Sequence, residues 1–196
     1  MMNIVIPKEC TAIYLLFSGG MDSSLLLYLI AEKIHEEKLN IPIFCVTFGT
    51  NYSTKAVKEV FEYVKNKFPI KMQVMHKKGN FLIRDITKKL LMVDTHYVYS
   101  GCNKVVENEF FPTKYIKNDT PPVRGEPYSE KHLRPFINID KRNILQIYVE
   151  KDILSLLDIT HSCGISRTEH CGECYFCMEK NWALEAFNLF YGEQNE

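Results

Sequence analysis

The most constraining feature of this sequence is a glycine pair between two apolar segments. Residues 12–17 form a short apolar run that is typical of a buried strand, and residues 23–34 form a longer one that suits a helix. The string FSGGMDSS, residues 17–24, joins them. Gly19 and Gly20 permit a tight turn and a close approach to an anion, and the start of a helix offers unpaired N–H groups and the positive end of its dipole. The arrangement predicts a phosphate-binding loop after the first strand.

The polar residues of this loop suit the phosphates of a nucleotide. Serine hydroxyls add donors, and the carboxylate of Asp22 can hold a Mg²⁺ ion that bridges phosphate oxygens. The GxxxxGK[ST] pattern of kinases and GTPases is absent. An ordinary helix cap after a glycine turn is the alternative interpretation of the same residues. The predicted nucleotide-binding residues are Ser18, Gly19, Gly20, Asp22, Ser23 and Ser24, and of these Asp22 and Ser23 are also predicted to act in catalysis.

The first half of the chain alternates between strand-like and helix-like segments. The expected strands are residues 12–17, 41–48, 70–75 and 97–100, and the expected helices are residues 23–34, 53–68 and 81–92. Strands that alternate with helices of this length predict an α/β fold. We expect a Rossmann-like parallel sheet with helices on both faces, and a ligand site beyond the carboxyl ends of its strands.

The second half is organised differently. Periodicity is lost between residues 101 and 135, and a long irregular loop of this kind in a compact domain is usually functional or mobile. Asp140 is expected to cap a helix that runs to about residue 157, and residues 179–191 are expected to form the last helix.

Four of the seven cysteines gather between these two helices. The pattern C-x7-C-G-x-C-x2-C is formed by Cys163, Cys171, Cys174 and Cys177. Four thiolates satisfy a tetrahedral zinc ion and leave no open position, which predicts a structural site rather than a catalytic one. Buried or redox-active cysteines are the alternative. His161 and His170 are expected to surround the site without ligating the metal.

The length of 196 residues permits one good-sized domain with a small appended subdomain. We therefore predict a nucleotide-binding α/β domain over residues 1–135 and a helical zinc-binding subdomain over residues 136–196.

Charge and cysteine usage restrict the partners and the compartment. Lysine plus arginine and aspartate plus glutamate both number 24, so a formal net charge of +0 gives no global field to attract nucleic acid or an anionic membrane. Seven cysteines without a secretory leader predict a reducing compartment, the cytoplasm. Residues 11–31 carry a single charge, but the SGG interruption and the change of period argue against a membrane span.

The loop string resembles the SGGxDSS signature of the PP-loop ATP pyrophosphatases. Together with the cysteine pattern it resembles the QueC family, the 7-cyano-7-deazaguanine synthases. The further residues that carry this resemblance are Ser162 beside Cys163, Ala186, Phe187, and the earlier Pro135, Ile139, Lys141 and Ile144. It covers both ends of the chain and the sheet between them.

The resemblance implies an activity with its cofactors. QueC enzymes adenylate the carboxylate of 7-carboxy-7-deazaguanine with ATP, admit ammonia to give an amide, and use a second ATP to dehydrate the amide to a nitrile. ATP and Mg²⁺, a structural Zn²⁺, and a product that is the nitrile or the amide are thus expected. The resemblance also places Phe48 and Gly101 at the nucleotide and Lys141 against the leaving pyrophosphate, although a lysine in the first turn of a helix is usually solvated.

The middle of the chain departs from the family pattern. Gly101 and Asn103 match the family's GxNxxD motif, whereas Val106 takes the aspartate position and Glu107 offers a carboxylate one residue later. The VPGRN segment, which lines the substrate sites in the family, is reduced to residues 77–80, and the YGQ segment is absent. These departures bear on the acceptor rather than on the phosphate loop.

A few other residues are candidates for contacts with the acceptor. Arg134 can bind phosphate or a carboxylate through two parallel hydrogen bonds. Phe110, Phe111 or Tyr115 can stack on a deazaguanine ring, with packing in a lid or core as the alternative. Cys102 follows the fourth strand and faces the site in this topology, although a small buried thiol is commoner than a nucleophile.

Three classes of function stay open at the level of the sequence. The first is a QueC-like ligase whose partners are a deazaguanine carboxylate and ammonia. The second is a PP-loop enzyme that modifies another acceptor, such as a tRNA base or a protein amine, and the third is a non-catalytic nucleotide-binding module. A homodimer is compatible with all three.

Overall fold

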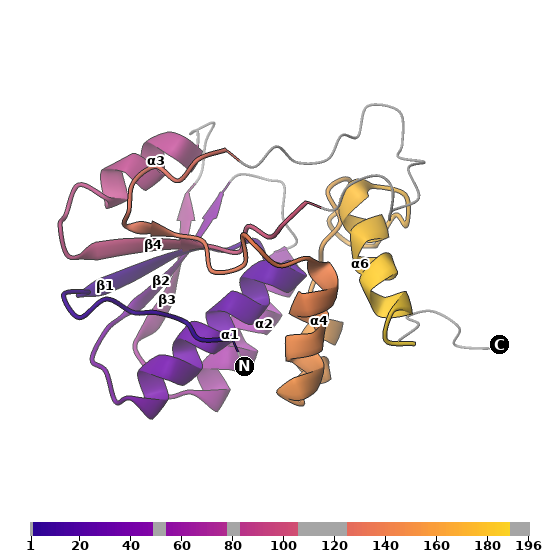
Figure 1. Ribbon diagram of the computed structural model, residues 1–196, viewed down its shortest axis with the longest axis horizontal. Helices are drawn as coiled ribbons and strands as arrows, with labels where there is room; N and C mark the ends of the chain where they lie inside the picture. Colours follow the sequence, from indigo (N-terminus) through magenta and orange to yellow (C-terminus); the bar gives the residue numbers. More distant parts are fainter. Residues whose placement is uncertain (1, 49–53, 78–82, 106–124, 189–196) are drawn as a thin grey trace.

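Five parallel strands form one sheet at the centre of the molecule, in the order β3-β2-β1-β4-β5 (Figure 1). The computed structural model describes residues 2–48, 54–77, 83–105 and 125–188. The strands are β1 Ala12–Leu16, β2 Ile43–Phe48, β3 Met72–Lys77, β4 His96–Ser100 and β5 His132–Leu133. All of the paired strands run in parallel, and this confirms the sheet that the alternating pattern predicts.

The central strand β1 is where the strand order reverses direction. Leu15 of β1 lies opposite Cys45 of β2 on one side and opposite Tyr99 of β4 on the other. The chain leaves β1 toward β2 and β3, and later returns to place β4 on the opposite edge of β1. Such a reversal opens a crevice beyond the carboxyl ends of the two central strands. The FSGGMDSS loop begins at that point.

Helices cover both faces of the sheet. Figure 1 shows α3 on one face and α1, α2 and α4 on the other. The helices are α1 Met21–Glu36, α2 Thr54–Lys67, α3 Ile83–Leu90, α4 Lys141–Glu150, α5 Leu154–Asp158 and α6 Tyr175–Glu185. Helix α1 is buried along most of its length because the sheet, α2, α4 and α5 surround it. That burial explains why its sequence is almost continuously apolar.

One hydrophobic core joins the two parts that the sequence separates at residue 135. Ile13 and Leu25 belong to the same buried cluster as Phe136, Ile144 and Leu184. Helices α4 and α6 also pack against each other. The carboxyl-terminal helices therefore pack directly on the part that contains the sheet and share its core.

The structure corrects three expectations about the second half. The helix expected over residues 140–157 is two helices, because Asp152 adopts a left-handed backbone conformation with φ 53° and ends α4. The last helix begins earlier than expected, at Tyr175, with Cys174 as its N-cap. The irregular segment before residue 135 contains β5, which is too short to show a period.

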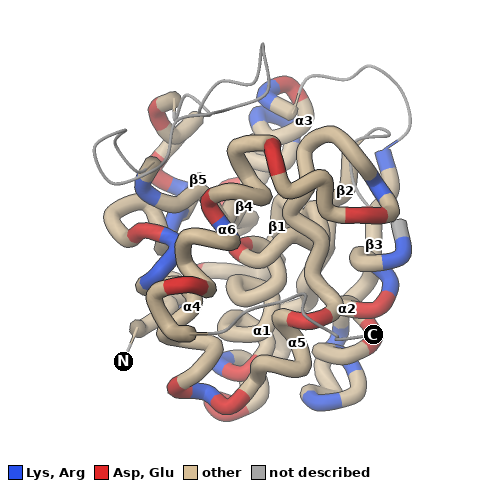
Figure 2. The backbone as a smooth tube through the Cα atoms, turned by 90° about the vertical axis from the view of Figure 1, so that its right-hand side faces the viewer, with Lys and Arg blue, Asp and Glu red and all other residues tan. Residues whose placement is uncertain are grey.

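Several predicted residues fall outside the described part of the chain. These are Val106, Glu107, Phe110, Phe111, Tyr115 and residues 78–80. Within the described helices, none combines the length and apolarity needed to cross a membrane. Figure 2 shows Lys and Arg interspersed with Asp and Glu around the molecule, so the equal numbers of the two signs are not separated into two opposite faces.

Candidate nucleotide and metal sites

A cleft of about 490 Å³ opens beyond the carboxyl ends of β1 and β4. The phosphate loop and the start of α1 form one wall, and Gly101 and Cys102 after β4 form another. The segment from His161 to Gly164 and the helix residue Phe176 close the third side. The cleft thus lies where a parallel sheet of this topology presents its ligand site.

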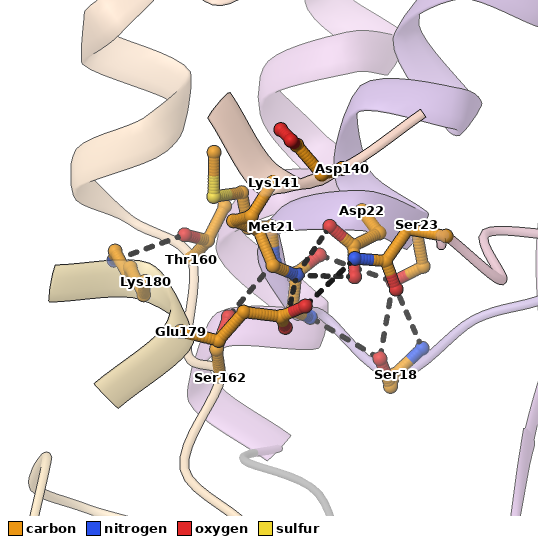
Figure 3. A network of polar contacts seen from close by, with 12 residues as sticks. Ser18, Met21, Asp22, Ser23, Asp140, Lys141, Thr160, Ser162, Glu179 and Lys180 are labelled. Carbon is orange, nitrogen blue, oxygen red and sulfur yellow. Dashed lines mark hydrogen bonds and ion pairs between the residues drawn. The ribbon is translucent and has the colours of Figure 1, made fainter. Parts of the chain in front are cut away.

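Serine hydroxyls hold the phosphate loop in shape. The Ser18 N–H donates to Ser23 Oγ at 3.3 Å, the two serine hydroxyls lie 3.1 Å apart, and the Gly20 N–H donates to Ser18 Oγ at 3.3 Å (Figure 3). Ser23 Oγ also donates to the Gly20 carbonyl at 3.2 Å. The loop is therefore preorganised by hydroxyl groups that can exchange these bonds for phosphate oxygens.

Two glycines are required by close backbone approaches. Gly19 has φ +76°, and a Cβ atom there would lie 2.9 Å from the backbone nitrogen of Val57. A Cβ atom at Gly101 would lie 2.9 Å from backbone atoms of Asp22 and Ser23. Gly101 therefore lets the end of β4 touch the first turn of α1, which brings the two walls of the cleft together.

A buried lysine ties the start of α1 to the last helix. Lys141 Nζ lies 2.6 Å from both carboxylate oxygens of Asp22 and 3.2 Å from Oε2 of Glu179 (Figure 3). Lys141 is 1% exposed and Glu179 is 0% exposed, whereas 21% of the Asp22 side chain is exposed. The alternative interpretation of Lys141, a solvated lysine in the first turn of a helix, is therefore wrong. We refer to Asp22, Lys141 and Glu179 below as the ion triad.

The charges around Lys141 decide its protonation. Burial lowers the pKa of Lys141, but the charges of Asp22 and Glu179 and their hydrogen bonds outweigh burial, so the pKa is raised above its ordinary value. Lys180 lies on the same helix as Glu179 and donates to Thr160 Oγ1 at 3.4 Å. Its pKa is lowered to about 8, first by burial and then by the charge of Lys141.

The carboxyl-terminal segment also bonds directly to the phosphate loop. Ser162 Oγ accepts from the Met21 N–H at 3.1 Å, and the His161 N–H donates to the Gly19 carbonyl at 2.9 Å. Tyr148 from α4 donates its hydroxyl to the Met21 carbonyl at 2.7 Å. These contacts fix the loop and the first residue of α1.

A second group of polar residues lines the cleft near β5. The Tyr128 N–H donates to His132 Nδ1 at 3.4 Å, which leaves the proton on Nε2 to be donated to Ser100 Oγ at 3.0 Å. Ser100 in turn donates to Cys102 Sγ at 3.5 Å. Burial, followed by the charge of Arg134, lowers the pKa of His132 to about 4, so the imidazole is neutral at pH 7.

Two further features give this end of the cleft its shape. The rings of Tyr128 and His132 are stacked with centroids 5.2 Å apart and planes 10° apart. The Arg134 guanidinium lines the cleft and donates to the Gly125 carbonyl at 2.5 Å. The cleft therefore ends in a flat aromatic pair beside a permanent positive charge.

The four predicted cysteine ligands come together at the start of α6. Their sulfur atoms all lie within 4.8 Å of one another. The Cys171 and Cys177 sulfurs are 4.0 Å apart, and the Cys163 and Cys174 sulfurs are 3.9 Å apart. Four thiolates around one ion with metal–sulfur bonds of about 2.3 Å require sulfur separations of this size. A four-iron cubane holds its cysteine ligands farther apart. The cluster therefore fits a single tetrahedral ion.

Backbone N–H groups point at these sulfurs as they do in metal knuckles. Cys163 Sγ accepts from the N–H groups of Ile165 at 3.4 Å and Ser166 at 3.2 Å. Burial raises the pKa of Cys163, but the hydrogen bonds outweigh it and lower the pKa to about 7. His170 Nδ1 lies 3.8 Å from Cys177 Sγ, and its ring is tilted by 30° against that of His161 with centroids 4.7 Å apart.

The structure brings some of the predicted nucleotide residues together and leaves others aside. Ser18, Gly20, Asp22, Ser23, Gly101 and Lys141 line the cleft. Gly19 instead packs against α2, Ser24 is fully buried behind the loop, and the half-buried Phe48 at the end of β2 is not among the cleft residues. Sequence reasoning missed the roles of Glu179 and His132, since neither belongs to a local motif. Asn103, noted only as a family match, is fully buried and donates to Glu179 Oε1 at 2.9 Å.

The fold of this chain is similar to that of known proteins, although its sequence is not. No protein-family model and no curated protein matches the sequence. The NMN synthetase from Francisella tularensis is 11% identical with a TM-score of 0.51, and the match covers 94% of this chain and 80% of that one. The chain shares this synthetase's fold, and the sheet order and loop position define that fold as the PP-loop fold, as the sequence predicts.

Two other solved structures are similar over most of this chain. The U34-tRNA thiolase NcsA from Methanococcus maripaludis, solved with its [4Fe-4S] cluster, is 14% identical with a TM-score of 0.48. That match covers 91% of this chain but only 65% of the thiolase. The NH3-dependent NAD synthetase from Campylobacter jejuni is 15% identical with a TM-score of 0.46, over 95% of this chain and 90% of that one.

Proposed function

We propose that this protein cleaves ATP between its α and β phosphates and transfers AMP to the carboxylate of a small planar acceptor. The observation that carries the proposal is the Asp22 carboxylate, which lines the cleft at the start of α1 and is held there by Lys141. This places one anionic group among the N–H and hydroxyl donors of a PP-loop. A kinase-like loop would present a lysine to the phosphates instead.

The residues of the cleft account for the chemistry of adenylation. The acceptor carboxylate oxygen attacks the α phosphorus, the bond from that phosphorus to the bridging oxygen breaks, and pyrophosphate leaves. The hydroxyls of Ser18 and Ser23 and the start of α1 stabilise the departing anion. Asp22 would hold Mg²⁺, which neutralises phosphate charge when bound with ATP. No general base is needed because a carboxylate is already a nucleophile.

We further propose that the acceptor is 7-carboxy-7-deazaguanine and that ammonia displaces AMP to give the amide. A second adenylation at the amide oxygen, followed by loss of AMP, then gives the nitrile. The resemblance to the QueC family motivates this choice. The flat Tyr128–His132 pair beside Arg134 supports it, because a bicyclic carboxylate needs a stacking surface and a cation.

Zinc is the metal that we propose for the four-cysteine cluster. The donor set is entirely thiolate, the sulfur separations fit one tetrahedral ion, and no position is open for a substrate. The zinc would therefore stabilise the segment that bonds to the phosphate loop and take no part in the reaction.

The decisive experiment is incubation with ATP, Mg²⁺, ammonium and 7-carboxy-7-deazaguanine, followed by mass spectrometry. We expect AMP, pyrophosphate and a deazaguanine amide or nitrile. Replacing Asp22 by Asn should lower the rate by at least about 100-fold, while Glu179 still neutralises Lys141 and keeps the chain folded. Formation of ADP, or an unchanged rate in the Asp22→Asn variant, would contradict the proposed role of the loop.

A second candidate is adenylation of a different acceptor, and one observation favours it. Cys102 lies in the cleft and accepts a hydrogen bond from Ser100, so a thiol is available beside the adenylation site. Thiolation of a tRNA base would use such a group as a persulfide, whose outer sulfur is supplied by a separate persulfide donor and replaces the base oxygen that leaves with AMP. The Cys102→Ser variant separates the two candidates, because it should retain amide synthesis and lose any sulfur transfer.

A further inference from the structure

We propose that Glu179 is a positioning residue that keeps a net negative charge on the Asp22 side of the ion triad, so that Asp22 can still bind Mg²⁺ although it is paired with Lys141. This inference rests on the proposed function. It explains why a carboxylate meant for a metal is bonded at 2.6 Å to a buried ammonium group.

The contacts of Glu179 hold its carboxylate in place against Lys141. Its Oε2 lies 3.2 Å from Lys141 Nζ, and its Oε1 accepts from Asn103 Nδ2 at 2.9 Å and from the Tyr175 hydroxyl at 3.3 Å. Both neighbours of Oε1 are fully buried. Glu179 is thus an oriented carboxylate that faces Lys141 (Figure 3), and unlike Asp22 and Lys141 it is not among the residues that line the cleft.

The net charge of the ion triad determines how strongly it attracts a cation in the cleft. Two carboxylates and one ammonium leave the ion triad with one net negative charge. Glu179 is 0% exposed and the Asp22 side chain is 21% exposed, so only Asp22 can share that charge with a ligand in the cleft. Without the charge of Glu179, Asp22 and Lys141 would form a neutral pair, and the attraction for a divalent cation would fall.

Other charges near the triad do not replace Glu179. Lys180, the next residue, extends toward Thr160, 3.4 Å away, and adds positive rather than negative charge. Lys180 is protonated below its pKa of about 8, so at pH 6.5 its charge is the same in every variant compared below.

The charge of Glu179 can be removed without changing its shape. Gln at position 179 keeps an oxygen for Asn103 and has nearly the same volume. The matched control is Glu185→Gln, which removes the same charge from an exposed position on the same helix. Mg²⁺ affinity is measured by calorimetry in the presence of a non-hydrolysable ATP analogue, with thermal unfolding of the nucleotide-free proteins alongside.

The expected result is on the order of tenfold weaker Mg²⁺ binding for Glu179→Gln and no change for Glu185→Gln. Glu179→Asp retains the charge and should lie close to the wild type. In the double variant Glu179→Gln with Lys141→Gln the net charge of the triad is again one negative unit, so Mg²⁺ affinity should recover. A purely structural role for Glu179 predicts no such recovery.

Two results would overturn the proposal. One is a Glu179→Gln variant that binds Mg²⁺ like Glu185→Gln, and the other is a double variant as weak as the single one. If Glu179→Gln does not fold, the double variant is compared with the wild type alone, because it contains no buried ammonium that has lost a carboxylate partner. Mg²⁺ binding by the double variant that is tenfold weaker than that of the wild type would then contradict the proposal. Failure of the proposed function is distinct, because the wild type itself would then bind no analogue or form no AMP.

Discussion

At the scale of single residues, the absence of a side chain at Gly101 allows the end of β4 to contact the start of α1. A Cβ atom there would lie 2.9 Å from backbone atoms of Asp22 and Ser23, which cannot move without displacing the start of α1. We expect Gly101→Ala to lower the free energy of unfolding by about 1–3 kcal/mol. It should also weaken binding of an ATP analogue, because the phosphate loop shifts.

Urea unfolding and calorimetry measure these two effects. Gly125→Ala is the control, since nothing lies within 4 Å of a Cβ atom at that position. Equal stability of the two variants would mean that β4 and α1 approach each other less closely than the structure shows.

His132 gives the molecule a dependence on pH. Its pKa of about 4 in the folded protein lies below the ordinary 6.5, so between these values the unfolded chain binds a proton that the folded chain does not. The free energy of unfolding should therefore fall as the pH drops from 6.5 toward 4, and His132 should contribute no further loss below that range.

The His132→Gln variant tests this contribution. It can still donate to Ser100 but cannot titrate, so its free energy of unfolding should fall less steeply over the same pH range. Urea titrations at pH 7, 6, 5 and 4.5 provide the comparison. Parallel curves for the two proteins would show that His132 is not the group responsible. The cysteine cluster, which is common to both, does not affect the difference.

At the scale of elements, α6 connects the cysteine cluster to the cleft. Cys174 is its N-cap, Cys177 lies in its first turn, and Glu179 follows within the same helix. We expect purified protein to hold about one zinc ion per chain, because a closed thiolate site contributes directly to folding. Removal of the metal should loosen α6 and weaken binding of an ATP analogue even though no cysteine of the cluster contacts phosphate.

Metal analysis and calorimetry before and after treatment with a chelator measure both effects. Cys174→Ser should lose zinc and solubility, whereas Cys102→Ser, which alters a cysteine outside the cluster, should retain one zinc ion. Folded wild-type protein with no zinc would refute the assignment, and unaltered nucleotide binding after zinc removal would refute the connection through α6.

The elements of the first half were predictable because each carries its own period. Apolar residues repeat at helical spacing in α2, and β1 and β2 are continuous apolar runs between turn residues. The division between α4 and α5 was not predictable, since the apolar spacing continues through Asp152 and an aspartate does not by itself indicate a left-handed backbone conformation. β5 depends on its pairing with β4.

At the scale of the whole molecule, the phosphate loop and the cysteine cluster were predictable because their residues are neighbours in the sequence. The ion triad was not. Lys141 is 119 positions from Asp22, and Glu179 is 76 positions from Asn103, so only the tertiary fold brings them together. Nothing local distinguishes Glu179 from a solvated acid on a helix.

The contacts between the phosphate loop and the carboxyl-terminal segment predict which regions of the molecule a bound nucleotide stabilises. An ATP analogue bound at the phosphate loop should slow amide hydrogen exchange in α6 as well as in α1, because Lys141 and Ser162 join the two regions. Exchange followed by mass spectrometry measures this, with the edge strand β3 as an internal reference that should not change. Protection confined to residues 18–24 and α1 would contradict the coupling.

The contact between Met21 and Ser162, which spans 141 positions, has a consequence for protein synthesis. A nascent chain makes the phosphate loop early but has to wait on the order of ten seconds, at about 5–20 residues per second, for the segment that completes it. Until α6 has left the ribosome, Lys141 lacks Glu179 and the first turn of α1 lacks Ser162. On the proposed function, incomplete translation products would therefore bind ATP with Mg²⁺ weakly, and unfinished copies of this protein would consume little nucleotide.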